Sequence, residues 1–331
     1  MQKSDIINAF AELGSALKQI PEEQIAKAGI MNPWFTPDFI RLAGSNWSQA
    51  LTEDKISTWL ETEPCETTNL KAGIIMAGNI PLVGLHDLLS VIAAGMQASI
   101  KLSSGDEVLM KFAINALCKA LPELNERIDT DGKLNGVNRL IATGSNNSAR
   151  YFEYYFRDVP ALIRKNRTSL AVLSGMEDDE TLGLLADDIF TYFGMGCRNV
   201  SHLILPRSID YKRLYESYDK YMDHVNHHKY YNNYMYHKSI LLMNLSKHYD
   251  NGFMLFQEKN ELHAPVATLN YHFYDNLSEA VAYIEQRKDE LQCVVSNISE
   301  IPSALPFGST QKPELWDYAD NTNVLNFLKQ A

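Results

Sequence analysis

Short apolar runs alternate with longer amphipathic stretches from about residue 71 onward. A short apolar run bounded by turn residues is typical of a buried strand, whereas apolar positions spaced three and four apart predict a helix. These criteria give strands at 72–77, 98–102 and 137–142, with helices at 82–96, 107–120 and 147–157. Strands that alternate with helices in this way predict a doubly wound α/β domain with a parallel sheet.

A second alternating block begins near residue 168, and residues 1–68 before the first block are polar and helical in pattern. In the second block the same criteria give strands at 170–173, 200–205, 266–273 and 291–296, with helices at 179–192, 209–222, 233–247 and 276–287. Trp34, Trp47 and Trp59 are candidate anchors of the N-terminal helical segment. We therefore expect two α/β domains.

Composition narrows the function classes. The net charge is -11, so a broad nucleic-acid interface is not expected, because phosphate binding needs a basic face. The longest apolar stretch, 88–96, is too short to span a bilayer, and residues 1–13 lack the pattern of a signal peptide. The four cysteines are widely spaced and form no CxxC pair, which favours a reducing cytoplasm over a disulfide framework or a zinc ribbon.

Cys197 is the first candidate for chemistry. It follows Gly194 and Gly196 in a turn between a predicted helix and a predicted strand. Such a turn leaves a thiol with little steric cover, and an accessible thiolate is a nucleophile. The preceding helix C-terminus would raise rather than lower the pKa of the thiol, so the pattern leaves the activation of Cys197 open.

Polar residues follow the first two predicted strands of the first block. Asn79 lies in a Gly-Asn-Ile-Pro turn after one strand, and Lys101 ends the next. Ligands of open α/β sheets bind beyond the carboxyl ends of strands, and a side-chain amide there can donate to an oxyanion. The turn is not a GxGxxG fingerprint. An ordinary turn and a solvated lysine are alternatives that these two segments leave open.

Taken together, these segments resemble the aldehyde dehydrogenase superfamily, and most closely its LuxC-like acyl-CoA reductase family. The matching segments, in chain order, are Asn79-Ile80-Pro81, Lys101-Leu102-Ser103, Gly144-Ser145, Gly194-Met195-Gly196-Cys197, Glu261-Leu262-His263-Ala264-Pro265-Val266 and Pro306-Phe307-Gly308. The resemblance covers about residues 70 to 310, and its specificity comes from the order and spacing of short motifs. It implies an aldehyde-dehydrogenase-like fold of two α/β domains with parallel-rich sheets.

The resemblance also implies domain roles and site residues. It assigns a helical segment plus a dinucleotide-binding domain to 1–167, a catalytic domain to 168–300, and a tail that is a candidate interface segment to 301–331. Cys197 would be the nucleophile, and Asn79 would stabilise the oxyanion. The implied cofactor contacts are Lys101, Ser103, Ser104, Gly144, Ser145 and, on the nicotinamide ribose, Glu261. No metal is implied.

Two departures from the superfamily pattern refine the expected activity. Members that oxidise aldehydes carry a glutamate that activates water, but residues 161–166 here contain no carboxylate. Members that prefer NAD often carry a glutamate where this chain has Ser104. A carboxylate at that position would repel a 2′-phosphate, so its absence favours NADPH and leaves NADH open.

The resemblance thus predicts NADPH-dependent reduction of a fatty acyl thioester to an aldehyde through a thioacyl-enzyme on Cys197. The expected substrate is acyl-CoA or the acyl group on an acyl carrier. Two further associations are left open, namely a homodimer and a complex with an enzyme that supplies the acyl group. Aldehyde oxidation, acyl-phosphate reduction and a non-catalytic partner subunit are the alternatives. The acyl chain length is not predicted.

The remaining polar candidates receive structural interpretations. His224, His227 and His228 would share a helical face if 224–228 were helical, but a polar pocket wall is favoured over a metal site. The cysteines at 65, 118 and 293 are interpreted as inert small hydrophobes. Asp187 and Asp188, on the helix before the nucleophile, are given no role.

Overall fold

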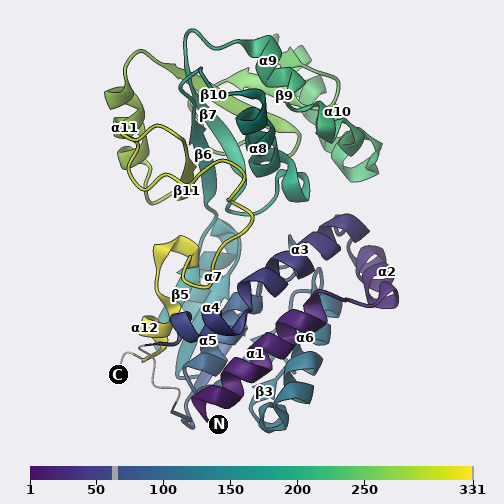
Figure 1. The fold of residues 1–331 in the computed structure, drawn as a ribbon, viewed down its shortest axis with the longest axis vertical. Coiled ribbons are helices and arrows are strands. Elements are labelled where there is room, and N and C mark those ends of the chain that lie inside the picture. Colours follow the sequence, from purple (N-terminus) through teal and green to yellow (C-terminus); the bar gives the residue numbers. More distant parts are fainter. Residues whose placement is uncertain (62–65, 330–331) are drawn as a thin grey trace. The chain divides into compact units, whose positions relative to one another are not determined.

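The computed structural model describes residues 1–61 and 66–329, and its chain divides into two compact units. One unit is Met1–Asn166 together with Pro313–Ala331, and the other is Arg167–Lys312. Each contains its own parallel-rich sheet (Figure 1). The residues after Lys312 therefore pack with the first unit, although they follow the second in sequence.

A five-stranded parallel sheet forms the centre of the first unit. Its strands are β1 (Lys71–Ile75), β2 (Gln97–Lys101), β3 (Ile128–Asp129), β4 (Arg139–Thr143) and β5 (Ala161–Arg164). Their order across the sheet is β3-β2-β1-β4-β5, and every pairing is parallel. The chain adds strands in one direction from β1 to β3 and in the other direction from β4, so β1 and β4 flank a topological switch point. Crevices at such points are the usual ligand sites of open α/β sheets.

Helices connect and cover these strands. The connecting helices are α5 (Leu85–Ala93), α6 (Glu107–Ala120) and α7 (Asn146–Tyr155), and the N-terminal layer is α1 (Lys3–Leu17), α2 (Glu22–Met31), α3 (Pro37–Ala50) and α4 (Glu53–Trp59). The apolar face of α1 packs on α6 and α3 and extends the core of the sheet. Trp59 is buried and donates from Nε1 to the Tyr318 hydroxyl at 2.8 Å, which ties the C-terminal segment with α12 (Val324–Lys329) to this layer.

A six-stranded sheet forms the centre of the second unit. Its strands are β6 (Thr168–Val172), β7 (Val200–Pro206), β8 (Tyr249–Asp250), β9 (Leu255–Glu258), β10 (Thr268–Tyr274) and β11 (Leu291–Val295), in the order β11-β6-β7-β10-β9-β8. All pairings are parallel except that of β8 with β9. Its helices are α8 (Asp179–Phe190), α9 (Tyr211–Glu216), the 3₁₀ helix Asp219–Asn226, α10 (His228–Met243) and α11 (Leu277–Gln286) (Figure 1). No helix in the described part of the chain is both long and apolar enough to cross a bilayer.

Several predicted elements differ from those observed. The helix predicted at 209–222 is two pieces, because α9 ends at Glu216 and a 3₁₀ helix follows. The helix predicted at 233–247 begins earlier and ends at Met243, with Leu245 in the left-handed region (φ 52°). The short strands β3, β5, β8 and β9 were not predicted. Each has only two to four residues, which is too short a run for the pattern of apolar and polar positions to mark it as a strand.

Candidate active site

The predicted site residues fall into two groups, one in each unit. Six of them lie at the carboxyl edge of the first sheet: Asn79 after β1, Lys101, Ser103 and Ser104 at and after the end of β2, and Gly144 and Ser145 after β4. Asn79, Lys101, Ser104 and Ser145 are exposed there. The strand order thus brings segments that are distant in sequence to the edge beside the switch point.

The loops after β1 and β2 pack closely against each other. A Cβ atom at Gly78 would lie 2.3 Å from Ser103 Oγ, and one at Gly105 would lie 2.6 Å from the Gly78 oxygen. Asn32 Nδ2 donates to both the Gly78 carbonyl (3.3 Å) and the Gly105 carbonyl (3.1 Å). The Asn79 turn and the Lys101–Ser103 segment therefore form one closely packed platform that excludes side chains at the two glycines.

Asp106 holds this platform from beneath, a role that sequence analysis did not assign. Its carboxylate is buried and accepts a hydrogen bond from the Leu82 N–H at 2.8 Å. Leu82 follows Pro81 and has a φ of 60°, a conformation that is costly for a leucine unless its surroundings maintain it. Burial raises the pKa of Asp106 well above its usual range, and hydrogen bonds from the Leu82 and Val83 backbone oppose that shift.

The N-terminus of α7 completes this edge. Ser145 is its N-cap and accepts a hydrogen bond from the Ser148 N–H at 3.2 Å. At Gly144 a Cβ would lie 3.0 Å from Ser148 Cβ, so the backbone before the helix is kept bare. A helix N-terminus at a switch point is a ready site for a phosphate group.

The stretch 161–166 carries only cations among its ionisable groups. Arg164, the last residue of β5, is buried and its Nη1 donates to the buried Asp87 carboxylate on α5 at 2.7 Å. Lys165 is paired with Glu153 at 3.0 Å. The strand begins with Ala161, whose side chain cannot accept a proton, and it ends with Arg164, whose guanidinium is already in an ion pair with Asp87.

Residues 191–197 lead to the candidate nucleophile Cys197 and are called the nucleophile turn; this turn is strained. The helix predicted to reach residue 192 ends at Phe190, and Tyr192 (φ 55°, ψ 34°) and Phe193 (φ 57°, ψ 27°) are left-handed. Gly194 and Gly196 have positive φ as well, which is the freedom that the glycine pattern predicted. Left-handed aromatic residues persist only where packing maintains them, and such strain is typical of functional sites. Cys197, half-buried and not in a disulfide, sits at the end of this turn, three residues before β7 begins.

Ser169 fixes the backbone of Cys197. Its Oγ donates to the Cys197 carbonyl at 3.1 Å and accepts from the Cys293 N–H at 3.1 Å, so it joins the turn to β6 and β11. Cys293 is buried, and Cys118 is half-buried, where burial raises the pKa of its thiol. Cys65 lies outside the described residues.

The Tyr/His-rich segment packs on the nucleophile turn. The Phe193 ring contacts those of His224 and His227, with centroids 4.6 and 4.5 Å away, and His224 donates from Nε2 to the Phe190 carbonyl at 3.0 Å. The three histidines do not share one helical face, because His224 lies in the 3₁₀ helix and His227 caps α10. Within the described residues no group of three metal-ligating side chains converges.

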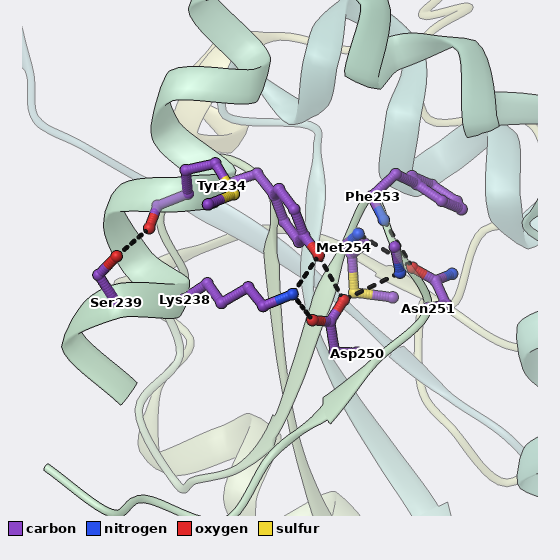
Figure 2. A network of polar contacts seen from close by, with 9 residues as sticks. Tyr234, Lys238, Ser239, Asp250, Asn251, Phe253 and Met254 are labelled. Carbon is purple, nitrogen blue, oxygen red and sulfur yellow. Dashed lines mark hydrogen bonds and ion pairs between the residues drawn. The ribbon is translucent and has the colours of Figure 1, made fainter. Parts of the chain in front are cut away.

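Helix α10 is attached to the sheet by a polar cluster in which Tyr234 is buried and Lys238 and Asp250 are partly exposed (Figure 2). Tyr234 donates to Asp250 Oδ1 at 2.6 Å, and Lys238 bonds both Asp250 Oδ2 at 2.7 Å and the Tyr234 hydroxyl at 3.2 Å. The pKa of Tyr234 is raised, first by burial and then by its hydrogen bond to Asp250. A phenol in this state is a poor acid, so we interpret the cluster as an anchor for α10, whose first turn supports Phe193.

Glu261 lies in the loop 259–267 between β9 and β10. Its side chain is exposed and pairs with Lys259 at 2.6 Å, whereas its backbone carbonyl accepts from Asn270 Nδ2 at 2.9 Å and lies 3.0 Å from His202 Nδ1. Ser201, next to His202, donates to the following carbonyl, that of Leu262, at 2.8 Å. Cys197 and the Glu261 loop therefore both lie at the amino end of β7.

Asp188 has a structural role that sequence analysis did not assign. It is buried on α8 and accepts from the N–H groups of Gly308 (2.7 Å) and Thr310 (3.1 Å) and from the Thr310 hydroxyl (2.7 Å). Burial raises its pKa. The bonds fix the Pro-Phe-Gly segment to the helix that leads into the nucleophile turn. An acidic residue among the apolar positions of α8 was the available signal.

Comparison with known proteins identifies the fold. No family model matches the sequence, and no curated protein matches it. Solved structures do match. An NAD-dependent benzaldehyde dehydrogenase from Corynebacterium glutamicum superposes with a TM-score of 0.68 at 11% identity, over 91% of this chain and 78% of that one. Aldehyde dehydrogenase 21 from Physcomitrella patens gives 0.64 at 12%, over 92% and 75%.

A third match is a mutant of the P. syringae indole-3-acetaldehyde dehydrogenase AldA in complex with NAD+ and IAA, with a TM-score of 0.62 at 13% identity over 92% of this chain and 74% of that one. The chain therefore has the aldehyde dehydrogenase fold, and the predicted fold class of parallel-rich α/β units is confirmed. The LuxC-like family within that superfamily stays a prediction.

Proposed function

We propose that this protein is an oxidoreductase of the aldehyde dehydrogenase superfamily that reduces acyl-CoA or an acyl-carrier thioester to an aldehyde, with NADPH as the reductant. Support comes from the fold, from Cys197 on a strained turn, and from the exposed polar residues at the carboxyl edge of the first sheet. The proposed reaction uses residues of both groups.

The first unit fits a nicotinamide dinucleotide. The α7 N-terminus would hold a phosphate, and the glycines at 78 and 144 keep the adjoining backbone bare. Lys101 and Ser104 are exposed at the same edge, and Lys101 supplies a positive charge for a ribose or phosphate oxygen. In the second unit the exposed carboxylate of Glu261 would accept from the nicotinamide ribose hydroxyls. When bound, the reduced cofactor supplies the hydride.

The residues of this chain would carry the remaining steps. The Cys197 thiolate attacks the thioester carbonyl carbon, and the developing oxyanion is stabilised by Asn79 and the Cys197 backbone N–H, at about 3 kcal/mol for each donor. Collapse of that adduct breaks the bond to the CoA sulfur, which leaves as a thiol after it takes a proton. With a hydride supplied by the cofactor, the same two donors would stabilise the second oxyanion, whose collapse would free the aldehyde and restore the Cys197 thiolate.

One observation carries the choice of reduction over aldehyde oxidation. Oxidation requires water to attack the thioacyl-enzyme, and that attack needs a positioned general base. The strand β5, where the resemblance places this base, carries Ala161, Leu162 and Ile163, and it ends in Arg164, whose guanidinium is already paired with Asp87. A buried cation in an ion pair does not accept a proton.

A panel of acyl-CoAs of different chain length, each mixed with NADPH, tests this function. We expect oxidation of NADPH, release of free CoA thiol in equal amount, and formation of the aldehyde. Cys197→Ala should abolish NADPH oxidation, CoA release and aldehyde formation. It should retain dinucleotide binding, because Cys197 does not belong to the first unit. Activity that survives in Cys197→Ala would refute the mechanism. If the wild-type protein only oxidises aldehydes, its function would instead be that of the superfamily members that oxidise aldehydes.

A further inference from the structure

Three buried polar side chains converge on consecutive carbonyls of the Glu261 loop. His202 and Asn270 both contact the Glu261 oxygen, Asn270 also donates to the His263 oxygen at 3.2 Å, and Ser201 donates to Leu262. The side chains are 0%, 2% and 4% exposed for His202, Asn270 and Ser201, respectively. They come from β7 and β10, where His202 and Asn270 are register partners.

The connection between β9 and β10 explains why these carbonyls need side-chain partners. The two strands are parallel neighbours, so the chain must run back along the sheet between them, and in most proteins a helix forms this crossover connection. Here the return is the irregular loop 259–267, whose backbone groups have no helical partners. Buried carbonyls must be satisfied, and side chains of the sheet do so.

The hydrogen bonds also determine the protonation of the two histidines. A carbonyl can only accept, so His202 Nδ1 carries the proton that it gives to Glu261. Neutral His202 then accepts at Nε2, which lies 2.6 Å from His272 Nδ1, so His272 carries its proton on Nδ1. Tyr283 lies against both rings, with centroids 5.4 and 4.4 Å away, and fixes their orientation. The donor to Glu261 is therefore held by a second layer of contacts.

At Glu261 a fixed backbone carries an exposed side chain. Its carbonyl receives two buried donors, while its carboxylate projects outside the packed loop and contacts only Lys259 among the pairs described. The adjoining Leu262 is buried in the core. Because the backbone of Glu261 is fixed at its carbonyl and at Leu262, its exposed carboxylate can reach only a limited set of positions.

We infer that His202 and Asn270, with His272 behind His202, are positioning residues that hold the Glu261 carboxylate for a ribose hydroxyl of the dinucleotide. The inference rests on the proposed function, because Glu261 acts on the cofactor only if one binds. A positioning role predicts a loss specific to cofactor binding. A role confined to satisfying buried carbonyls predicts a loss of stability alone.

The test compares two substitutions of one residue. His202→Leu removes the donor to the Glu261 carbonyl, whereas His202→Asn keeps an N–H at the place of Nδ1. We expect the Kd for NADPH to rise about tenfold in His202→Leu, which corresponds to a loss of about 1.4 kcal/mol of binding free energy, and to return close to the wild-type value in His202→Asn. Asn270→Leu should resemble His202→Leu. The burst of CoA release from acyl-CoA without cofactor should be unchanged in all three, because it depends on Cys197.

Ser296→Ala is the matched control. Ser296 is also buried in the second unit and donates to a backbone carbonyl, that of Val172, at 2.9 Å, but among the described residues no hydrogen bond joins it to loop 259–267. Its loss should lower the melting temperature and leave the Kd for NADPH unchanged. If His202→Leu does not fold, Asn270→Leu and the less disruptive Ser201→Ala provide the same comparison.

Three results would overturn the inference, and they are distinguishable. A Kd in His202→Leu and Asn270→Leu equal to that in Ser296→Ala would show that the contacts are structural only. A Glu261→Gln variant with wild-type Kd would show that the carboxylate has no cofactor to hold, while the proposed function would stand. A wild-type protein that binds neither NADPH nor NADH would remove the proposed function together with the inference.

Discussion

The buried carboxylate of Asp106 accepts a hydrogen bond from the backbone N–H of Leu82, 2.8 Å away, and so links the loop after β2 to the loop after β1. Leu82 is left-handed and directly follows the turn that holds Asn79. The candidate oxyanion residue thus depends on a carboxylate that lies after the next strand. Neither residue alone marks this dependence in the sequence.

Asp106→Ala should therefore destabilise the protein and slow acylation. Leaving the buried Leu82 N–H without an acceptor costs about 1–3 kcal/mol, and the released turn should misplace Asn79. Urea unfolding measures the first effect and the burst of CoA release measures the second. Asp106→Asn is the matched variant, because its amide keeps one oxygen that can accept from the Leu82 N–H and has no ionisable group. If the alanine and asparagine variants behave alike, the hydrogen bond to Leu82 does not support the turn.

The strand ends of the first unit could be predicted because they depend on local pattern. The helix predicted at 107–120 is α6, and Asn79, Lys101 and Ser145 lie at the sheet edge because alternating strands and helices place the ends of parallel strands together. Such positions follow from chain order once the class of fold is known.

The supporting residues could not be predicted, because their partners are remote in sequence. Asp188 bonds to Gly308 and Thr310, and His202 bonds to the Glu261 loop. The left-handed Tyr192 and Phe193 were missed for a related reason. An aromatic residue has no local preference for that conformation, so packing from the 3₁₀ helix and α10 must impose it.

Ser104→Glu should reverse the expected preference for NADPH. Ser104 is exposed beside Lys101, where a carboxylate would approach the 2′-phosphate. Two like charges about 4 Å apart repel each other by about 1 kcal/mol in bulk water and by about 4 kcal/mol near a protein surface. A change of about 1.4 kcal/mol in binding free energy changes the Kd tenfold. We expect the Kd for NADPH to rise at least about tenfold, with little change for NADH. Fluorescence titration measures both constants.

Ser104→Gln serves as the uncharged control, with similar bulk and no repulsion. Equal weakening of NADPH binding in the glutamine and glutamate variants would mean that size, not charge, decides at this position. A wild-type protein that binds NADH and rejects NADPH would contradict the assignment of the cofactor.

The pair formed by buried His202 and half-buried His272 should make the stability of the protein fall in mild acid. Burial, with His272 and Arg287 nearby, lowers the pKa of His202 to about 3, against an ordinary value of 6.5. Between those values the unfolded chain binds more protons than the folded one, so the stabilisation present above pH 6.5 is lost as the pH falls towards about 3. The slope for one such proton is up to about 1.4 kcal/mol per pH unit. Burial lowers the pKa of His272 as well, and its effect has the same sign.

Urea unfolding of wild type and His202→Asn across this range isolates the contribution. The variant should show a shallower loss of unfolding free energy with acid, because asparagine does not titrate. The exposed His228 provides the matched substitution, His228→Asn, which should keep the wild-type slope. Parallel curves for wild type and His202→Asn would show that the His202 pair does not contribute to the acid sensitivity.

The thioacyl-enzyme on Cys197 should survive in water. It can lose its acyl group to CoA, to hydride or to hydroxide, and attack by water at neutral pH usually gains about 10²–10⁴ in rate from a positioned base. The strand that would carry this base ends in Arg164, held by Asp87, and the next residue, Lys165, is paired with Glu153. Without cofactor, acyl-CoA should therefore leave an acyl adduct visible by intact mass, and Cys197→Ala should not form it. Introducing a carboxylate at the start of β5, as Ala161→Glu, should shorten the lifetime of the adduct, whereas Ala161→Gln should not. Rapid CoA-independent conversion of aldehyde to acid by the wild-type protein would show that a base acts from elsewhere in the chain.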